Sequence, residues 1–153
     1  KAMKAPNRAA DPQAGGQVFA RNCVRCHGAE GQGERTGKVG DAQGYNVPPL
    51  WGKDSFNDGA GMSRLLMAMR FAKHNMVKNL TDDQAYDVAA YVVSQPRPHK
   101  ANLEKDFPAK WNKPVDAAFP PYVDGASAEQ HKYGPFAPLA EKMKALKEKL
   151  SKQ

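Results

Sequence analysis

The sequence predicts an all-α fold, with one compact domain followed by an extended arm. A length of 153 residues allows one modest core. The strongest helical signal is "LTDDQAYDVAAYVV", in which Thr81 and Gln84 match a capping box. Apolar residues follow that box at helical spacing: Ala85, Val88, Ala89 and Val92. Twelve prolines and thirteen glycines predict long irregular connections between the helices.

An earlier helix is expected in "AGGQVFARN", and it leads into "CVRCHG". This short stretch contains both cysteines of the chain, Cys23 and Cys26, with His27 directly after them. A thiol-disulfide pair usually lies beside a βαβ pattern, and a structural zinc site needs a second ligand pair. The sequence offers neither companion. Cys-x-x-Cys-His is instead the motif of c-type haem attachment.

The spacing of the motif suits that chemistry. Because positions three apart share one face of a helix, Cys23 and Cys26 can each form a thioether with one of two adjacent haem vinyl groups. His27 then becomes the proximal iron ligand, and Gly28 lets the chain turn sharply away. The motif uses both cysteines, so we predict one haem c as the cofactor and no disulfide.

The sixth coordination position of the iron has several candidate ligands. They are Met62, Met67, Met69, Lys73, His74 and Met76. The stretch "SRLLMAMRFA" predicts a helix with Ser63 as its N-cap. Its core-facing residues would be Leu65, Leu66, Met67 and Met69. Met76 lies in a predicted loop, residues 73–79, between two helices, and a ligand on such a loop can reach the haem face. We therefore predict Met76 as the distal ligand, with His74 as the alternative.

These features together resemble the class I c-type cytochromes: a helix that ends in the haem motif, a later loop with a methionine, and a helix that opens "LTDDQAYDVAAYV". The segments "NVPPLWGKDSFNDGAGMSRLLMAMRFAKHNM", "YDVAAYVVSQPRPHK" and "FPPYVDGASAEQHKYGPF" extend the resemblance to the carboxy-terminal haem domain of dihaem thiosulfate dehydrogenases. This similarity covers about residues 14–138. It implies a class I cytochrome c fold around one covalently bound haem.

The resemblance also implies site residues and marks two departures. The family's distal methionine corresponds to Met76, but the usual Pro-Leu-Gly after it is replaced by Val77, Lys78 and Asn79. A loop without that proline is less rigid, which predicts exchange of Met76 for Lys73 or His74 at high pH. The family's catalytic haem lies in another domain with its own Cys-x-x-Cys-His and a cysteine ligand. This sequence contains neither, so it resembles the electron-exit half.

Other haem contacts are expected in the loop "GKVGDAQGYNVPPLWG", which has the Gly, Pro and Asn content of irregular structure. Pro49, Leu50 and Trp51 are predicted to cover the apolar edge of the haem. Arg70, and also Arg64, can pair with haem propionates because guanidinium binds carboxylate well. The alternative for either arginine is a solvated helix face.

Composition changes after Ser94, and we divide the chain there. Residues 1–95 form the predicted mono-haem core, and residues 96–153 form a Pro-rich arm that packs on it. After Pro138 a short, basic, amphipathic helix is expected. Its apolar stripe would be Leu139, Met143, Leu146 and Leu150.

The formal charge of +7 favours an acidic redox protein as the partner. Lysines that can flank an exposed haem edge are Lys38, Lys53, Lys73, Lys78 and Lys132. No nucleic-acid recognition module is present. No run approaches the roughly 20 apolar residues of a membrane-spanning helix. The chain begins at Lys1 rather than at an initiator methionine, which predicts export to the periplasm with the signal removed.

The sequence therefore favours a periplasmic electron carrier that passes single electrons between redox proteins, and the resemblance implies a link to sulfur-compound oxidation. One alternative is a thiosulfate dehydrogenase-like enzyme, or a domain or subunit of one. Another is a sensor that binds a small gas at a displaceable sixth position. A second haem motif would favour the enzyme, whereas a distal methionine favours the carrier.

Overall fold

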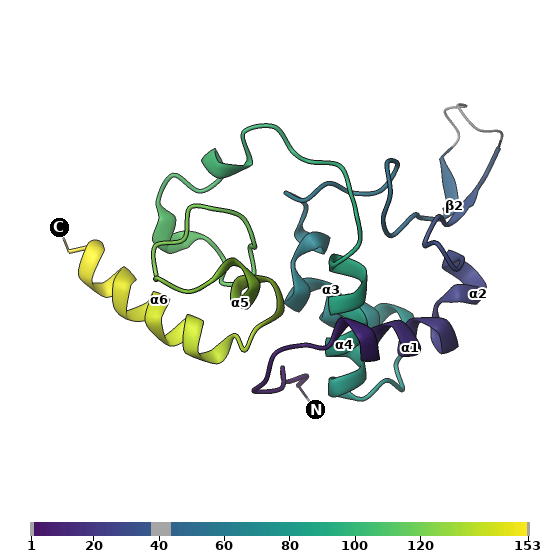
Figure 1. Ribbon diagram of the computed structural model, residues 1–153, viewed down its shortest axis with the longest axis horizontal. Helices are drawn as coiled ribbons and strands as arrows, with labels where there is room; N and C mark the ends of the chain where they lie inside the picture. The colour runs from purple at the N-terminus through teal and green to yellow at the C-terminus, as the bar shows by residue number, and fades with distance from the viewer. Residues whose placement is uncertain (1, 38–43, 153) are drawn as a thin grey trace.

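The computed structural model describes residues 2–37 and 44–152 (Figure 1). Its α-helices are α1 (Pro12–Asn22), α2 (Val24–His27), α3 (Leu65–Phe71), α4 (Asp82–Val93), α5 (Ala128–Tyr133) and α6 (Ala137–Leu150). Short helical turns are η1 (Gly61–Ser63), η2 (Ala72–Met76), η3 (Leu103–Lys105) and η4 (Lys110–Asn112). Two short antiparallel strands, β1 (Glu34–Arg35) and β2 (Tyr45–Val47), form a small hairpin. The all-α prediction is confirmed in this helix-dominated architecture.

The centre of the fold is the contact between α1 and α4, which Figure 1 shows side by side. A Cβ at Gly15 would lie 1.8 Å from the carbonyl oxygen of Asp87, so only glycine allows the two backbones to approach this closely. One turn along α1, the Phe19 ring lies 5.2 Å from the Trp51 ring and 5.3 Å from the Tyr91 ring. Close backbones and interlocked aromatic rings together set the crossing of these helices.

Both helices begin as local sequence rules predict. Asp11 caps α1 by accepting hydrogen bonds from the backbone amides of Gln13 and Ala14. Thr81 accepts from the Gln84 amide, and the Gln84 side chain accepts in return from the Thr81 amide. The predicted capping box is therefore confirmed.

The start of α3 differs from the prediction. Ser63 is not the N-cap, because its hydroxyl lies 2.9 Å from the Asp58 carbonyl and 2.6 Å from the Ala60 carbonyl and donates within η1. Arg64 occupies the capping position instead. Leu65 and Met69 are buried as predicted, whereas the prediction that Met67 packs in the core is wrong, since its side chain is exposed. The η1 turn occupies residues 61–63, so α3 begins only at Leu65.

The segment predicted as loop 73–79 is helical in its first half, which corrects that prediction. The chain continues from α3 without a break into η2, a π-helical turn closed by a 2.8 Å hydrogen bond from the Val77 amide to the Ala72 carbonyl. Only residues after Met76 leave the helix before α4 begins. A π turn holds one residue more than an α turn, so it changes which side chains share a face.

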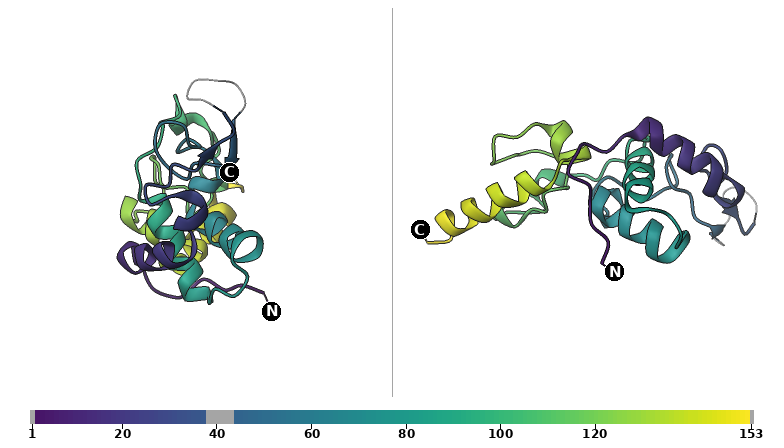
Figure 2. Two further views of the ribbon diagram at one scale, coloured as in Figure 1. Left: turned by 90° about the vertical axis from the view of Figure 1, so that its right-hand side faces the viewer. Right: turned by 90° about the horizontal axis from the view of Figure 1, so that it is seen from below.

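The carboxy-terminal arm, described over residues 96–152, packs against the core at its near end and extends beyond it at the other. Phe136 and Leu139, at the start of α6, belong to the same buried apolar cluster as Tyr86 of α4. Figure 1 and the right view of Figure 2 place α6 and α2 at opposite ends of the molecule. Of the predicted stripe on α6, Leu139 and Met143 are buried. The division of the chain near residue 95 stays a prediction. No helix in residues 2–37 or 44–152 has the length and apolar character needed to cross a membrane.

Candidate haem site

The Cys-x-x-Cys-His motif lies where α1 gives way to α2. Cys23 separates the two helices and packs partly against the apolar core, while Cys26, in α2, is exposed. Gly28 ends α2 with a φ of +84°. A Cβ there would also lie 2.4 Å from the side chain of Gln32. The sharp turn predicted at Gly28 is confirmed, and it leaves the His27 side chain at the end of a helix.

The environment of Cys23 disfavours a charged sulfur. Burial, together with the neighbouring Cys26, raises the pKa of Cys23 to about 11. A thiolate for metal binding or disulfide exchange is therefore suppressed at neutral pH. A thioether carries no charge, so burial of its sulfur costs little. The partly buried position of Cys23 is compatible with a thioether sulfur.

The imidazole of His27 is held by one hydrogen bond. Its Nδ1 lies 3.1 Å from the carbonyl oxygen of Pro48. Because a carbonyl can only accept, Nδ1 carries the proton and Nε2 keeps its lone pair. A histidine that donates its second N–H to a carbonyl is oriented and made more basic as a metal ligand. This is the arrangement that an iron ligand needs.

Residues 48–52, which we call the proximal loop, are fixed by several backbone contacts. The Leu50 amide donates to the Gly31 carbonyl at 2.8 Å, and the Gly52 amide donates to the Pro96 carbonyl at 2.7 Å. The Ser55 hydroxyl donates to the Pro49 carbonyl at 3.1 Å. These bonds tie the loop to the segment after the haem motif and to the beginning of the arm. They hold the Pro48 carbonyl opposite His27.

The predicted contact residues of this loop have different surroundings. Pro49 and Trp51 are buried, and Leu50 is half-buried against the core. Trp51 packs on Phe19 and on the backbone of Gly31, where a Cβ would lie 2.5 Å from the indole ring. The loop therefore presents an apolar wall beside the motif. Its role at a haem edge stays a prediction.

A row of exposed apolar side chains follows α3 and η2, and we call it the distal stripe. It consists of Met67, Phe71 and Met76, which are 37%, 42% and 52% exposed. Met67 and Phe71 are four positions apart and share a face of α3. The π turn then places Met76, five positions after Phe71, on that same face. Without this turn, Asn75 would occupy the position below Phe71.

The two arginines predicted near the propionates differ. Arg70 is exposed and has no ion pair or hydrogen bond within the part of the chain that the structure describes. Arg64 forms an ion pair that the sequence did not predict, because its Nε lies 2.8 Å from Oδ1 of the buried Asp116. It fastens the arm to the core while 28% of its side chain stays exposed, and its contact with a propionate stays a prediction. No hydrogen bond links Arg70 or Met76 to the motif among the described residues.

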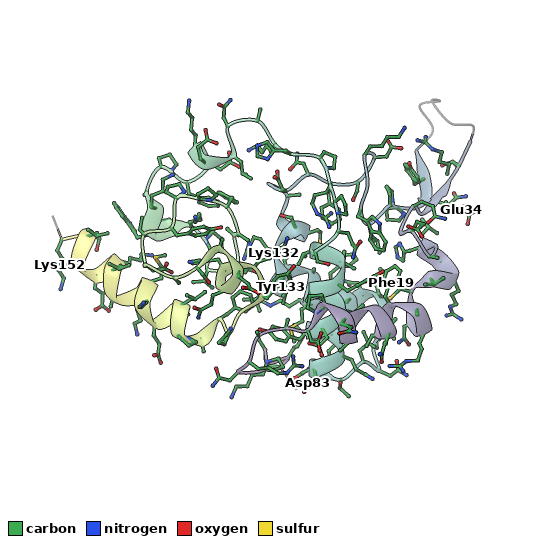
Figure 3. All side chains as sticks on the ribbon, viewed as in Figure 1. Phe19, Glu34, Asp83, Lys132, Tyr133 and Lys152 are labelled. Atoms are coloured by element: carbon green, nitrogen blue, oxygen red, sulfur yellow. The ribbon has the colours of Figure 1, made fainter. Side chains whose placement is uncertain are left out.

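The predicted docking lysines are also dispersed. Lys38 lies outside the described residues, whereas Lys53 and Lys78 are on the surface. Lys73 forms a 2.5 Å ion pair with Asp82 at the start of α4. Figure 3 shows Lys132 in the middle of the molecule, beside Tyr133, whose ring it contacts. Lys132 is a less accessible docking residue than the sequence implied.

Comparison with known proteins identifies the family. A family model described as cytochrome c matches residues 12–96, more than half of the chain. The chain belongs to the cytochrome c family. Cytochromes c hold a covalently bound haem c, and a single haem fits this single domain. The predicted cofactor and the role in electron transfer are therefore confirmed at the level of the family.

Individual relatives narrow the comparison. The thiosulfate dehydrogenase of Stutzerimonas stutzeri is 44% identical over 102 residues, which cover 64% of this chain and 32% of that protein. That of Allochromatium vinosum is 45% identical over 89 residues, or 55% and 31% of the two chains. The solved thiosulfate dehydrogenase TsdBA of Marichromatium purpuratum matches with a TM-score of 0.59 and 34% identity, over 71% of this chain and 23% of that one. This cytochrome c spans about a third of the length of the curated relatives it matches.

The sequence did not identify Arg97 as a residue of this site. Its guanidinium lies 3.0 Å from the Leu50 carbonyl in the proximal loop. The only local signal was its position in "QPRPH", shortly after α4. Its partner lies 47 residues earlier in the chain, so the tertiary fold had to bring the two together.

Proposed function

We propose that this cytochrome c holds its haem through thioether bonds to Cys23 and Cys26 and that His27 is the proximal iron ligand. The observation that carries the proposal is the hydrogen bond between His27 Nδ1 and the Pro48 carbonyl, which leaves Nε2 as the donor atom. The half-buried Cys23 and the exposed Cys26, at the junction of α1 and α2, add support. When bound, the haem supplies an iron centre that accepts and releases one electron.

We assign the distal ligand to Met76. Its support is the distal stripe, in which the π turn aligns Met76 with Met67 and Phe71. Met69, the competing methionine of α3, is fully buried among core side chains, so its sulfur is not available to bind the haem iron. Methionine as the second ligand raises the reduction potential of a haem, which suits a carrier of electrons.

With His27 and Met76 as its ligands, the haem iron would offer no open site to a substrate. We therefore propose outer-sphere electron transfer between redox proteins as the function of the chain, in the periplasm and within sulfur-compound oxidation. The similarity to one third of several thiosulfate dehydrogenases supports the sulfur link. It equally favours a second candidate, in which the domain serves a thiosulfate dehydrogenase as its electron-transfer part.

The proposed partner presents an acidic surface to this basic protein. Lys53, Lys78 and Arg70 are accessible from solvent and available for such an encounter. Attraction between exposed charges is screened over about 8 Å at physiological ionic strength. The second-order rate of electron transfer should therefore fall as salt rises. A rate that does not depend on salt would remove the acidic partner from the proposal.

Two measurements test the ligand assignment. Denaturing mass spectrometry should show a mass increased by one haem, with neither thiol alkylated. The methionine-iron charge-transfer band of the oxidised protein should disappear in Met76→Ala and remain in Met69→Leu, a control that conserves core volume. Loss of the band in the control alone would transfer the ligand role to Met69. Sustained thiosulfate oxidation by the purified chain would overturn the carrier assignment.

A further inference from the structure

Arg97 makes an unusual set of contacts directly after α4. Its Nη1 donates to the Leu50 carbonyl at 3.0 Å, and its Nη2 donates to the Val92 carbonyl at 2.6 Å. The guanidinium carbon also lies 4.4 Å from the centre of the Phe56 ring. One side chain thus joins the proximal loop to the last turn of α4.

The charge of Arg97 is partly buried and is not matched by a carboxylate. No ion pair to Arg97 occurs within residues 2–37 and 44–152, and the nearest acidic influence is the more distant Asp58. Burial of the guanidinium lowers the pKa of Arg97, and the distant Asp58 offsets only part of this effect. Burying a cation is costly unless its donors are satisfied, and here carbonyl oxygens and an aromatic face satisfy them. The arrangement orients backbone carbonyls rather than neutralising an acid.

The Leu50 carbonyl, which accepts from Arg97, lies two residues after the Pro48 carbonyl, which accepts from His27. The backbone amide of Leu50 donates to the Gly31 carbonyl at 2.8 Å. The Leu50 residue is therefore fixed through both its amide and its carbonyl. That leaves little freedom for Pro48, whose carbonyl accepts from His27 Nδ1 at 3.1 Å.

We propose that Arg97 is a positioning residue for the proximal ligand. It fixes the proximal loop so that the Pro48 carbonyl stays hydrogen-bonded to His27, and it thereby sets the basicity of the imidazole. This inference rests on the proposed role of His27 as iron ligand. Arg97 acts through the loop and contacts neither His27 nor any other predicted ligand by a hydrogen bond.

Two effects of Arg97 on the reduction potential have opposite signs. The hydrogen bond from Nδ1 makes His27 a stronger donor, which favours ferric iron and lowers the potential. A nearby positive charge favours ferrous iron and raises the potential. Arg97→Lys keeps the charge but cannot bridge two carbonyls with the geometry of a guanidinium. Positioning therefore predicts a more positive potential in Arg97→Lys.

The test uses the intact holoprotein in its diamagnetic ferrous form. Nuclear magnetic resonance of ¹⁵N-histidine-labelled protein measures the exchange of the His27 Nδ1 proton with solvent. We expect exchange about tenfold faster in Arg97→Lys, the size of effect that follows from loss of one hydrogen bond. The matched control is Arg8→Lys, because Arg8 binds Asp83 and Asp87 near the opposite end of α4. Arg8→Lys should lower stability and leave both the exchange rate and the potential unchanged.

The outcomes separate the alternatives. Unchanged exchange in Arg97→Lys, with a lower potential in Arg97→Gln, would show that only the charge matters and would overturn the proposal. If Arg97→Lys and Arg8→Lys changed the exchange rate and the potential equally, general destabilisation would explain the effect. That result would also overturn the proposal. A native protein without histidine ligation would refute the proposed function itself, independently of any Arg97 variant.

Discussion

The core and the carboxy-terminal arm are stabilised in different ways. Residues 12–96 surround an apolar cluster in which α1 and α4 cross closely at Gly15. In the arm, short helices and turns surround buried charges. Among described residues, four of the five buried polar side chains belong to the arm: Lys113, Asp116, Asp124 and His131. A segment with few regular helices leaves more polar groups to satisfy, so its stability depends on specific partners rather than on apolar area.

The centre of the arm is the buried pair of His131 and Asp124. His131 Nε2 lies 3.0 Å from Oδ1 of Asp124, and His131 Nδ1 lies 2.7 Å from the Val115 carbonyl. Because the Val115 carbonyl can only accept, Nδ1 donates to it, and the pair with Asp124 is made through Nε2. Burial by itself would raise the pKa of Asp124, but hydrogen bonds from His131 and the Ala126 amide outweigh it and lower that pKa. The Tyr122 ring stacks on the imidazole at 4.5 Å.

The largest expected effect comes from breaking this pair. His131→Leu leaves the buried Asp124 carboxylate without its His131 partner and should lower the free energy of unfolding of the arm by about 3–5 kcal/mol. Hydrogen exchange and limited proteolysis would detect release of α5 and α6, while the haem spectrum of the core stays unchanged. His99→Leu is the matched control, because His99 also pairs with an aspartate but its side chain is 70% exposed. That control should change stability by no more than about 0.5 kcal/mol. Similar losses in both variants would contradict the role of burial.

A smaller effect is expected where the core is most tightly packed. In Gly15→Ala the new methyl group meets the Asp87 carbonyl at 1.8 Å, and α1 must move away from α4. Such overpacking costs about 1–3 kcal/mol, and thermal unfolding of the holoprotein would measure it. Gly16→Ala serves as the control, since its methyl group would lie 3.2 Å from the Tyr91 ring edge and alanine favours the helix. If Gly16→Ala were as damaging as Gly15→Ala, close backbone approach would not be the cause.

The smallest effect concerns Tyr86, which connects the two regions. Its hydroxyl lies 2.8 Å from the Arg8 carbonyl and 3.0 Å from the Tyr133 carbonyl. Burial raises the pKa of Tyr86 to about 12. The neutral phenol is favoured in the folded protein, so its contribution is complete below about pH 10 and is lost as the pH rises through 12.

Tyr86→Phe should therefore lower stability by about 1 kcal/mol at neutral pH and weaken the alkaline loss. Urea unfolding between pH 7 and pH 11.5 measures both quantities. Tyr91→Phe is the control, because the Tyr91 hydroxyl has no hydrogen-bond partner within the described part of the chain and its ring packs in the core. An alkaline loss as steep in Tyr86→Phe as in the native protein would assign the effect to another group.

Local features of this protein were determined by the sequence alone. The haem motif, the turn at Gly28 and the Thr81–Gln84 capping box each depend on residues within a few positions of one another. The helix α4 and the buried positions Leu65 and Met69 follow from apolar spacing in the same way. Short-range rules suffice here because the interacting residues lie within a few positions of one another, so little chain entropy is lost when they come into contact.

Only the tertiary structure decided the features that join distant segments. Arg64 binds Asp116, Arg97 binds the Leu50 carbonyl, and His131 binds Val115 across separations of 52, 47 and 16 residues. The sequence also did not predict the π turn of η2, which contacts α4 and makes residues 72–76 helical where a loop was expected. Each of these contacts requires a buried polar group to find a partner that folding alone brings near. Composition and periodicity contain no information about which partner that is.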